Sequence, residues 1–487
     1  MASKLHHLNE LEQVLCNNEK TDEGVLAFHK RFKMVRLLKP FEGIKTKGYS
    51  LHMLIFFLCI YRLRGLSIWA MQRVGNKNLF GGDENSFYRL MNNERMNWRK
   101  LLMSFAKQFL TLAHANGDQT TERVKCFVID DTDLVKTGKT IEFISRIFNH
   151  VNRTYPLGFK MLTLGLYDGK SLIATDFSLH REKGKSGNYG MNKKERKAQF
   201  HKKRSKESPS YNRVQEIDEN KNEVAVSMIK RAVKNGLMAS YVLMDSWFTN
   251  DYMIKSIRSI KKGAIHLLGM CKMDNRKYCV NGKELNSHQI IIRNERKMGK
   301  YSRKHKSHYI SIVANYKGEK AKLFYIKYRN SKNWTLLLTT NLTLKFVQAI
   351  ELYQIRWTIE VLFKECKQYL RLGACQNTDF DGQIADATMA LITHTILTLQ
   401  RRFEAYETMG ELFRESQQHL LELTLWERIL KVFIKILQQL SEILTIDIDE
   451  TIEKIMQSEK AGKQLLAMLT ALNEFADNDE YKGQIAA

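Results

Sequence analysis

Residues 126–134 read Cys-Phe-Val-Ile-Asp-Asp-Thr-Asp-Leu, a short apolar and β-branched run that ends in acidic residues. A run of this kind predicts a buried strand. Two further β-rich runs, 159–167 and 172–179, follow it and are joined by Asp168-Gly169-Lys170. Since an Asp-Gly pair between such runs is a strong hairpin signal, three strands are predicted in succession.

The pattern then changes from strand to helix and back. Apolar residues at helical spacing predict a helix over 213–235, which Gly236 closes, and a second buried-type strand follows over 239–245. The order strand, strand, strand, helix, strand, with acidic residues where strands end, predicts a mixed α/β sheet.

Between the hairpin and that helix lies a basic segment, Arg181 to Arg213. It holds 12 Lys and Arg residues against three acids, Glu182, Glu195 and Glu207. Its composition favours a disordered, solvated loop in the free protein. The same cations can bind phosphates by counterion release when DNA is present.

Residues 1 to about 120 are predicted to be helical. The longer helices are expected over Leu51–Arg64 and Met96–His114. Two shorter candidates, Ser67–Val74 and Asn85–Met91, have helix–turn–helix spacing, and Ser86–Arg89 on the second is a candidate for entering a DNA groove. A small helical bundle without DNA contact accounts equally well for this pattern.

The second half of the chain is first strand-rich and then helical. Strands are predicted over 266–270, 278–280, 289–292, 309–314, 321–327 and 334–340. Helices are predicted over 343–372, 381–404, 408–422, 425–445 and 449–474.

Composition narrows the class of protein. The chain has 487 residues, enough for two to four structural units, and 44% of them are hydrophobic, which excludes global disorder. Its 78 Lys and Arg against 52 Asp and Glu give a net charge of +26. A charge excess of this size favours a polyanionic partner, and nucleic acid above all.

Apolar segment length, the N-terminal sequence and the cysteine pattern predict a cytoplasmic protein associated with the nucleoid. The longest apolar stretch, Leu51 to Tyr61, is too short for a membrane span, which needs about 20 residues. The N-terminus has no apolar signal-peptide core. The seven cysteines are scattered without C-x-x-C spacing, so neither a disulfide framework nor a zinc site is expected.

The helix predicted over 343–372 carries the spacing Tyr353-x2-Arg356-x3-Glu360-x6-Lys367. At about 100° per residue these four side chains share one helix face, and apolar side chains occupy the opposite one. On spacing alone, an amphipathic helix with i,i+4 ion pairs on a solvated face accounts for this pattern.

Acidic residues elsewhere in the chain could form a site together with Glu360 on this helix face. Asp130 and Asp131 end one apolar run, Asp245 ends another, and Glu360 lies far downstream. Carboxylates that a fold brings together suit Mg²⁺ or Mn²⁺, and two such ions about 3.5–4 Å apart can catalyse phosphoryl displacement. An Asp after a strand is also common in turns, so the residues alone leave a structural role equally open.

The sequence resembles the bacterial insertion-sequence transposases with a D-D-E triad on an RNase H-like fold, specifically the insertion sequence four family. The spacing over 353–367 matches their Y-R-E-K signature, and Val128–Asp133 and Val242–Phe248 resemble supporting segments. The resemblance covers about residues 60–405. It implies an α/β fold, an RNase H-like mixed-sheet core with a β-rich insertion and flanking helical domains.

The resemblance also implies a division into domains. The expected parts are 1–120, a helical DNA-binding domain; 121–263, the first part of the catalytic core with the basic loop 181–213; 264–345, the β-rich insertion; 346–375, the second part of the core; and 376–487, a helical C-terminal domain that is a candidate for dimerisation.

Carried over residue by residue, the resemblance implies that Asp131, Asp245 and Glu360 are the catalytic ligands of two Mg²⁺ ions, with Mn²⁺ as a substitute. It favours Asp131 because that residue directly precedes Thr132. Strand alternation puts Asp130 on the opposite side from Asp131.

The same resemblance assigns DNA contacts. Tyr353 and Arg356 would contact phosphates near the cleaved end, and Lys367 would hold the DNA backbone. Trp334 resembles the residue that stacks on a flipped base, although a role in the core of a sheet accounts for it equally.

The resemblance implies a DNA transposase that acts by cut-and-paste. Hydrolysis at the ends of the element, a hairpin intermediate and strand transfer to target DNA are expected. The partners would be the terminal inverted repeats, the target duplex and a second copy of the chain in the synaptic complex, with no membrane. The alternatives are a transposase-derived nuclease and a non-catalytic DNA-binding protein.

Overall fold

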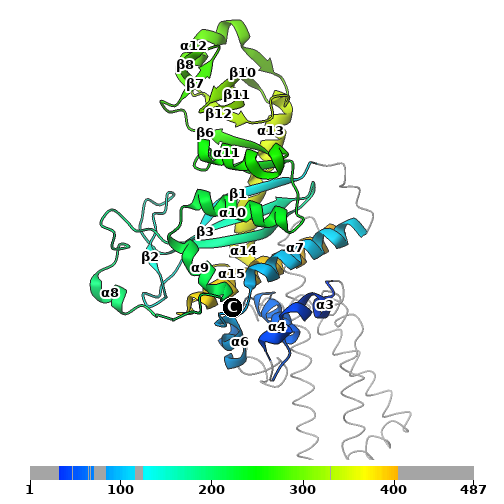
Figure 1. The fold of residues 1–487 in the computed structure, drawn as a ribbon, viewed down its shortest axis with the longest axis vertical. Helices are drawn as coiled ribbons and strands as arrows, with labels where there is room; N and C mark the ends of the chain where they lie inside the picture. The colour runs from blue at the N-terminus through cyan, green and yellow to red at the C-terminus, as the bar shows by residue number, and fades with distance from the viewer. Residues whose placement is uncertain are drawn as a thin grey trace, which may run out of the picture. The chain divides into compact units, whose positions relative to one another are not determined.

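The computed structural model describes residues 32–45, 48–63, 65, 67–70, 84–115, 124–329 and 331–403 (Figure 1). These residues belong to one of the two compact units of the chain, Phe32–Glu411. The helices predicted over 408–422, 425–445 and 449–474, and the turn predicted before Asn85–Met91, lie outside the described residues.

A mixed sheet forms the centre of this unit. Its core strands are β1 (Cys126–Val135), β3 (Leu157–Tyr167), β4 (Leu172–His180), β5 (Tyr241–Met244) and β6 (His266–Cys271). They lie in the order β4-β3-β1-β5-β6, in which β4, β3 and β1 are antiparallel and β1, β5 and β6 are parallel. The predicted mixed α/β fold is confirmed, and this order is consistent with an RNase H-like core.

The predicted hairpin between β3 and β4 is also present. Asp168 Oδ1 accepts hydrogen bonds from the backbone N–H groups of Lys170, at 3.1 Å, and Ser171, at 2.9 Å. Gly169 has a φ of 102°, a conformation that costs glycine little. The turn chemistry read from the sequence therefore closes the hairpin as expected.

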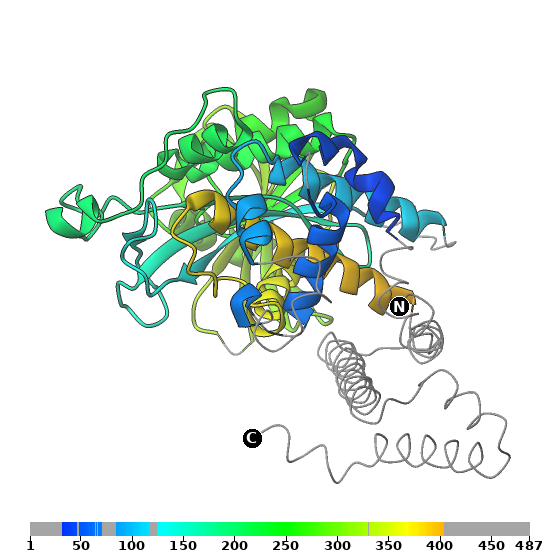
Figure 2. The same cartoon turned by 90° about the horizontal axis from the view of Figure 1, so that it is seen from below.

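Helices cover both faces of the core strands. The main ones are α7 (Trp98–Ala115), α10 (Lys221–Lys234), α11 (Asp251–Ser259), α14 (Trp357–Tyr369) and α15 (Phe380–Phe403). Helix α10 packs on β3 and β4, and Figure 2 shows it on the other side of the strands from α15. None of the described helices combines the length and the apolarity needed to span a bilayer.

Short helices from the N-terminal part pack onto this core. They are α3 (Met34–Leu38), α4 (Leu51–Leu63) and α6 (Glu84–Met91). The Phe87 ring of α6 is 0% exposed and lies 5.1 Å from the Tyr61 ring of α4. Phe87 therefore belongs to the apolar core and is not exposed as the sequence suggested, whereas Arg89 is exposed, and entry of the segment Ser86–Arg89 into a DNA groove stays a prediction.

The β-rich insertion extends the sheet beyond β6. It comprises β7 (Lys277–Val280), β8 (Lys283–Asn286), α12 (Ser287–Met298), β9 (Lys300–Ser302), β10 (Ser307–Tyr316), β11 (Glu319–Tyr328) and β12 (Thr335–Thr339). The sheet continues in the order β6-β12-β11-β10-β7-β8, and Figure 1 shows these strands stacked above the core.

Two of the predicted elements differ from the structure in detail. Residues 289–292 were predicted as a strand but lie in α12, because Asn286 and Gln289 form a reciprocal capping box that starts a helix. The helix predicted over 213–235 is divided into α9 (Pro209–Gln215) and α10, since Asn220 caps a new helix.

Candidate active site

Two of the acidic residues meet where β5 ends beside the middle of the longer strand β1. Strands β1 and β5 pair with Val128 opposite Leu243, and this register places Asp130 level with Asp245, two residues further on. Residues at the same level in parallel neighbours project to the same face of a sheet. The carboxylates of Asp130 and Asp245 therefore lie side by side, although 115 residues separate them in the sequence.

A tight turn after β5 fixes Asp245. Its Oδ1 accepts hydrogen bonds from the backbone N–H groups of Trp247, at 2.9 Å, and Phe248, at 3.2 Å. The Thr249 hydroxyl donates to the Asp245 carbonyl at 2.7 Å. Gly269 on β6 makes room for this turn, because a Cβ there would lie 2.3 Å from Thr249 Oγ1.

The third acidic residue reaches the same site through an arginine. Arg356 Nη1 lies 2.8 Å from Asp130 Oδ2, and its Nη2 lies 2.6 Å from Glu360 Oε1. One guanidinium thus joins the middle of β1 to helix α14. The structure brings together Asp130, Asp245, Arg356 and Glu360.

This geometry depends on a helix break that the sequence did not predict. The single helix expected over 343–372 is two helices, α13 (Phe346–Gln354) and α14, which begins at Trp357. The carbonyl of Ile355 accepts from the Thr358 N–H, at 3.0 Å, and from the Thr358 hydroxyl, at 2.7 Å. A threonine hydroxyl that bonds locally in this way competes with the regular helix ladder.

Asp131 occupies the other face of β1. Its carboxylate pairs with Lys221, at the start of α10. Asp133, on the same face, lies 2.5 Å from Lys160 Nζ and 3.0 Å from Asn149 Nδ2. Of the neighbouring pair that the sequence singled out, the structure therefore brings Asp130, and not Asp131, to Arg356 and Glu360.

The surroundings of Asp130 hold the pKa of its carboxyl above the usual value. Burial, together with the nearby charges of Asp245 and Asp131, raises its pKa to about 7, although Arg356 opposes this rise. Desolvation and like-charge neighbours act in this way on carboxylates. A carboxylate of this kind, next to a second one at the end of a strand, is a candidate cation ligand.

The aromatic and basic residues of the signature lie around this group. Burial raises the pKa of Tyr353 to about 12, and Asp245 and Asp130 contribute to the same shift. The Arg356 guanidinium lies 5.9 Å from the Tyr353 ring centroid. Lys367 Nζ donates to Thr132 Oγ1 at 2.8 Å, on the Asp130 face of β1. Tyr353, Arg356 and Lys367 thus border the carboxylates.

Trp334 lies apart from them, in the insertion. It directly precedes β12 and is half-buried, and Lys327 Nζ lies 5.9 Å from its ring centroid. Two exposed tryptophans that the sequence reading passed over are closer in the chain to the acids. Trp247 follows Asp245 by two residues and Trp357 follows Arg356 directly, with 48% and 62% of their surfaces exposed.

The chemistry of the donors fits a hard divalent cation. Carboxylate oxygens are the ligands that Mg²⁺ and Mn²⁺ prefer. Among the described residues no three metal-ligating side chains form a ready-made cluster. The reason is visible in the contacts, because Arg356 stands between Asp130 and Glu360 and neutralises both.

Comparison with known protein families agrees with this geometry. Residues 67–261 match the family model described as DDE superfamily endonuclease, and residues 174–396 match the one described as transposase DDE domain. The first match contains Asp130 and Asp245, and the second contains Asp245 and Glu360. No curated protein matches the sequence.

Proposed function

We propose that this chain, which matches a transposase DDE domain over residues 174–396, is a metal-dependent DNA-cleaving enzyme that moves an insertion sequence by a cut-and-paste reaction. The observation that carries the proposal is that Arg356 joins Asp130 to Glu360, while the β1–β5 register brings Asp245 level with Asp130. Its substrates would be the terminal inverted repeats of the element and a target duplex. Two copies of the chain would hold the two ends.

We assign Asp130, Asp245 and Glu360 as the ligands of two divalent cations, Mg²⁺ or Mn²⁺. Bound there, the cations would activate the attacking oxygen and neutralise the leaving oxygen. This assignment differs from the one implied by family resemblance, in which Asp131 was the first ligand. Its support is the contact of Asp130 with Arg356 and the pairing of Asp131 with Lys221.

The chain's own residues position the DNA. Arg356 neutralises Asp130 and Glu360 in this structure, and once cations neutralise them its guanidinium can bind a phosphate next to the cleaved bond. Tyr353 lies beside this arginine, and we propose that it helps to orient the guanidinium. Lys367, held near the end of β1 by Thr132, would contact the DNA backbone.

The reaction would begin with water, which attacks a phosphodiester at the end of the element and frees a 3′-OH. That hydroxyl would attack the opposite strand to form a hairpin, and hydrolysis of the hairpin would regenerate it for transfer to target DNA. Each step exchanges one phosphodiester bond for another or for a hydroxyl, so positioning and electrostatics suffice for catalysis.

The test is a product analysis with the full chain. The protein is incubated with Mg²⁺, labelled DNA that ends in the element's repeats, and a supercoiled plasmid. We expect 3′-end nicks, a hairpin product on a denaturing gel and insertion of the label into the plasmid. Cleavage without insertion would identify a nuclease, and binding without cleavage would identify a non-catalytic protein; either result overturns the proposal.

Trp334 separates hairpin chemistry from simple hydrolysis. We expect Trp334→Ala to spare first-strand nicking and to slow hairpin formation about tenfold, since an aromatic face returns roughly 1–3 kcal/mol of stacking to a flipped base. A substrate that lacks the terminal base should partly rescue the variant. If nicking, hairpin formation and thermal stability fall together, Trp334 is a core residue instead.

A further inference from the structure

The basic segment that follows β4 is folded. Residues Lys183–Glu207, here called the basic arm, contain the short helix α8 (Lys193–Lys197), which Asn192 and Glu195 start with a capping box. Backbone hydrogen bonds join the arm to the segment between β1 and β3, from Arg146 N–H to the Tyr189 carbonyl at 3.0 Å and from Phe200 N–H to the Thr140 carbonyl at 2.8 Å. The predicted disordered loop is therefore wrong.

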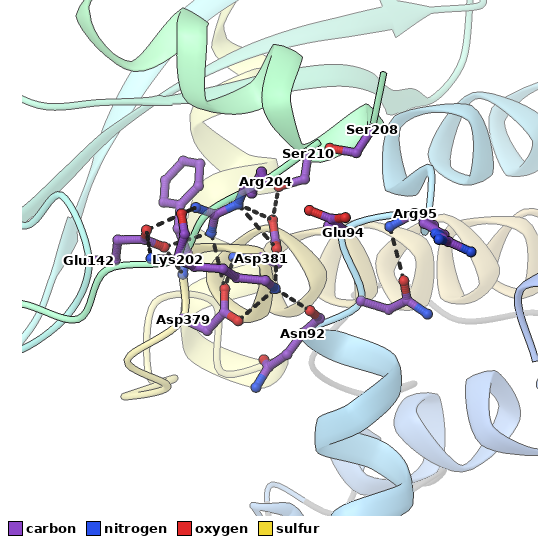
Figure 3. Close-up of polar contacts among 12 residues, drawn as sticks. Asn92, Glu94, Arg95, Glu142, Lys202, Arg204, Ser208, Ser210, Asp379 and Asp381 are labelled. Carbon is purple, nitrogen blue, oxygen red and sulfur yellow. Dashed lines mark hydrogen bonds and ion pairs between the residues drawn. The ribbon is translucent and has the colours of Figure 1, made fainter. Parts of the chain in front are cut away.

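A buried charge network anchors the returning half of the arm (Figure 3). The Arg204 side chain is 3% exposed and lies 2.6 Å from Glu142 and 3.2 Å from Asp379. Lys202 Nζ lies 2.9 Å from Asp379 and 2.7 Å from Asp381. These contacts tie the arm to the start of α15.

The charges in this network are buried and depend on one another. Burial alone would lower the pKa of Arg204, yet its hydrogen bond to Glu142 and the charges of Asp381, Glu142 and Asp379 raise it. Burial also raises the pKa of Asp379, although Lys202 opposes that shift. A buried cluster of this kind is stable only when each charge is paired, so it holds the arm in one arrangement.

The arm presents cations to solvent. The exposed ones are Lys183, Lys185, Lys193, Lys194, Arg196, Lys197, Lys203 and Lys206. Of the acids among them, Glu195 is only partly exposed and pairs with Lys139 at 2.9 Å, and Glu207 is exposed. Figures 1 and 2 both show α8 standing out from the core strands.

The arm begins beyond the end of β4, and β4 ends three residues past the level of Asp130, because Asp130 of β1 lies opposite Thr163 of β3 and Thr163 lies opposite Phe177 of β4. Asp133 of β1 lies opposite Lys160 of β3, and Lys160 lies opposite His180, the last residue of β4. The carboxyl end of β1 and the first residues of the arm thus lie at the same end of the sheet. The Lys139–Glu195 ion pair then joins α8 to the loop that follows β1.

We propose that the basic arm is a preformed surface for the phosphate backbone of duplex DNA, with α8 as its main contact. The proposal rests on the proposed function and adds to it a second DNA contact outside the metal site. Its occupant is duplex that continues from the active site, either next to the cleaved end or in the target. Neither source requires the arm to read sequence.

Two physical arguments favour this occupant over bulk water. Four cations within five residues repel one another in α8, and one glutamate offsets only part of that repulsion, whereas a polyanion would remove it. Because the buried network already orders the arm, binding loses less conformational entropy than it would with a flexible loop.

The test compares two quadruple variants of the full chain. The arm variant is Lys193→Ala, Lys194→Ala, Arg196→Ala and Lys197→Ala, which keeps the capping box. The control is Lys230→Ala, Lys234→Ala, Lys261→Ala and Lys262→Ala, which removes the same charge from exposed sites at the opposite edge of the sheet. The probes are a duplex with the element's end, a random duplex and strand transfer into a plasmid.

For the arm variant we expect the slope of log affinity against log salt to flatten by about 2 or more, since each phosphate contact contributes about 0.9. The control should keep the wild-type slope. Loss of duplex binding would identify DNA at the cleaved end as the occupant, and loss of strand transfer alone would identify target DNA.

Slopes and strand transfer that stay at the wild-type level in the arm variant would overturn the arm proposal. Such a result would leave the metal site untouched. Wild-type protein that does not cleave would instead overturn the proposed function.

Discussion

Asp130→Asn is expected to lower the rate of DNA cleavage by at least about 1000-fold, or ~4 kcal/mol of transition-state stabilisation, while DNA binding is retained. Asparagine preserves the size of the side chain and removes the charge that a divalent cation requires. Arg356 forms ion pairs with Asp130 and Glu360 in the wild type, and in this variant it keeps the pair with Glu360. The substitution therefore changes the proposed cation site and the ion pair with Arg356.

Asp131→Asn is the matched control, one residue along the same strand. Its carboxylate faces α10 and pairs with Lys221, so cleavage should stay within about tenfold of the wild-type rate. Single-turnover cleavage of a labelled end, with binding measured in Ca²⁺, compares the two variants. Retained cleavage in Asp130→Asn together with lost cleavage in Asp131→Asn would reverse the assignment.

Arg204→Ala is expected to lower the free energy of unfolding of the described unit by about 3–5 kcal/mol, because it leaves buried carboxylates without their cation. Glu142, Asp379 and Asp381 all lose a partner. The loss should be larger at pH 8 than at pH 5, since protonation relieves the unpaired charges and a raised carboxyl pKa costs stability above it.

Lys203→Ala serves as the control for this variant. It removes the adjacent exposed cation and should change the free energy of unfolding by less than about 0.5 kcal/mol. Urea denaturation followed by circular dichroism at both pH values gives the comparison. Equal stability of Arg204→Ala and the wild type would show that the network does not anchor the arm.

The core strands were predictable because a buried strand consists mostly of apolar residues that are consecutive in the sequence. Strand β3 is buried along nearly its whole length and β4 throughout, and apolar residues predominate in both, although polar residues such as Lys160 and Asp176 interrupt them. The Asp168-Gly169 turn was predictable for the same reason, since its chemistry is local. Long helices such as α15 also carry their own periodicity.

Other features depend on residues far apart in the chain. Sequence alternation separates Asp130 from Asp131, but only the β1–β5 register and Arg356 show which one faces Glu360. The basic arm resembled a loop because its anchors, Asp379 and Asp381, lie more than 170 residues away. Composition alone cannot reveal such pairs.

Local competition explains the remaining differences. The break before α14 arises where Thr358 bonds to the Ile355 carbonyl, while the surrounding pattern of apolar residues continues without interruption. Residues 289–292 contain three isoleucines in a row, which favour a strand, yet the Asn286–Gln289 capping box starts a helix there. In both places side-chain hydrogen bonds outweighed the periodic signal.

The central claim is that Asp130, Asp245 and Glu360 hold divalent cations, and iron-directed cleavage of the protein tests it most directly. Fe²⁺ takes the place of Mg²⁺ in oxygen-rich sites, and with ascorbate and peroxide it cuts the polypeptide next to the bound ion. We predict cuts near residues 130, 245 and 360 that excess Mg²⁺ suppresses and that Asp130→Asn abolishes. Cuts elsewhere, or the same cuts in Asp130→Asn, would contradict the claim.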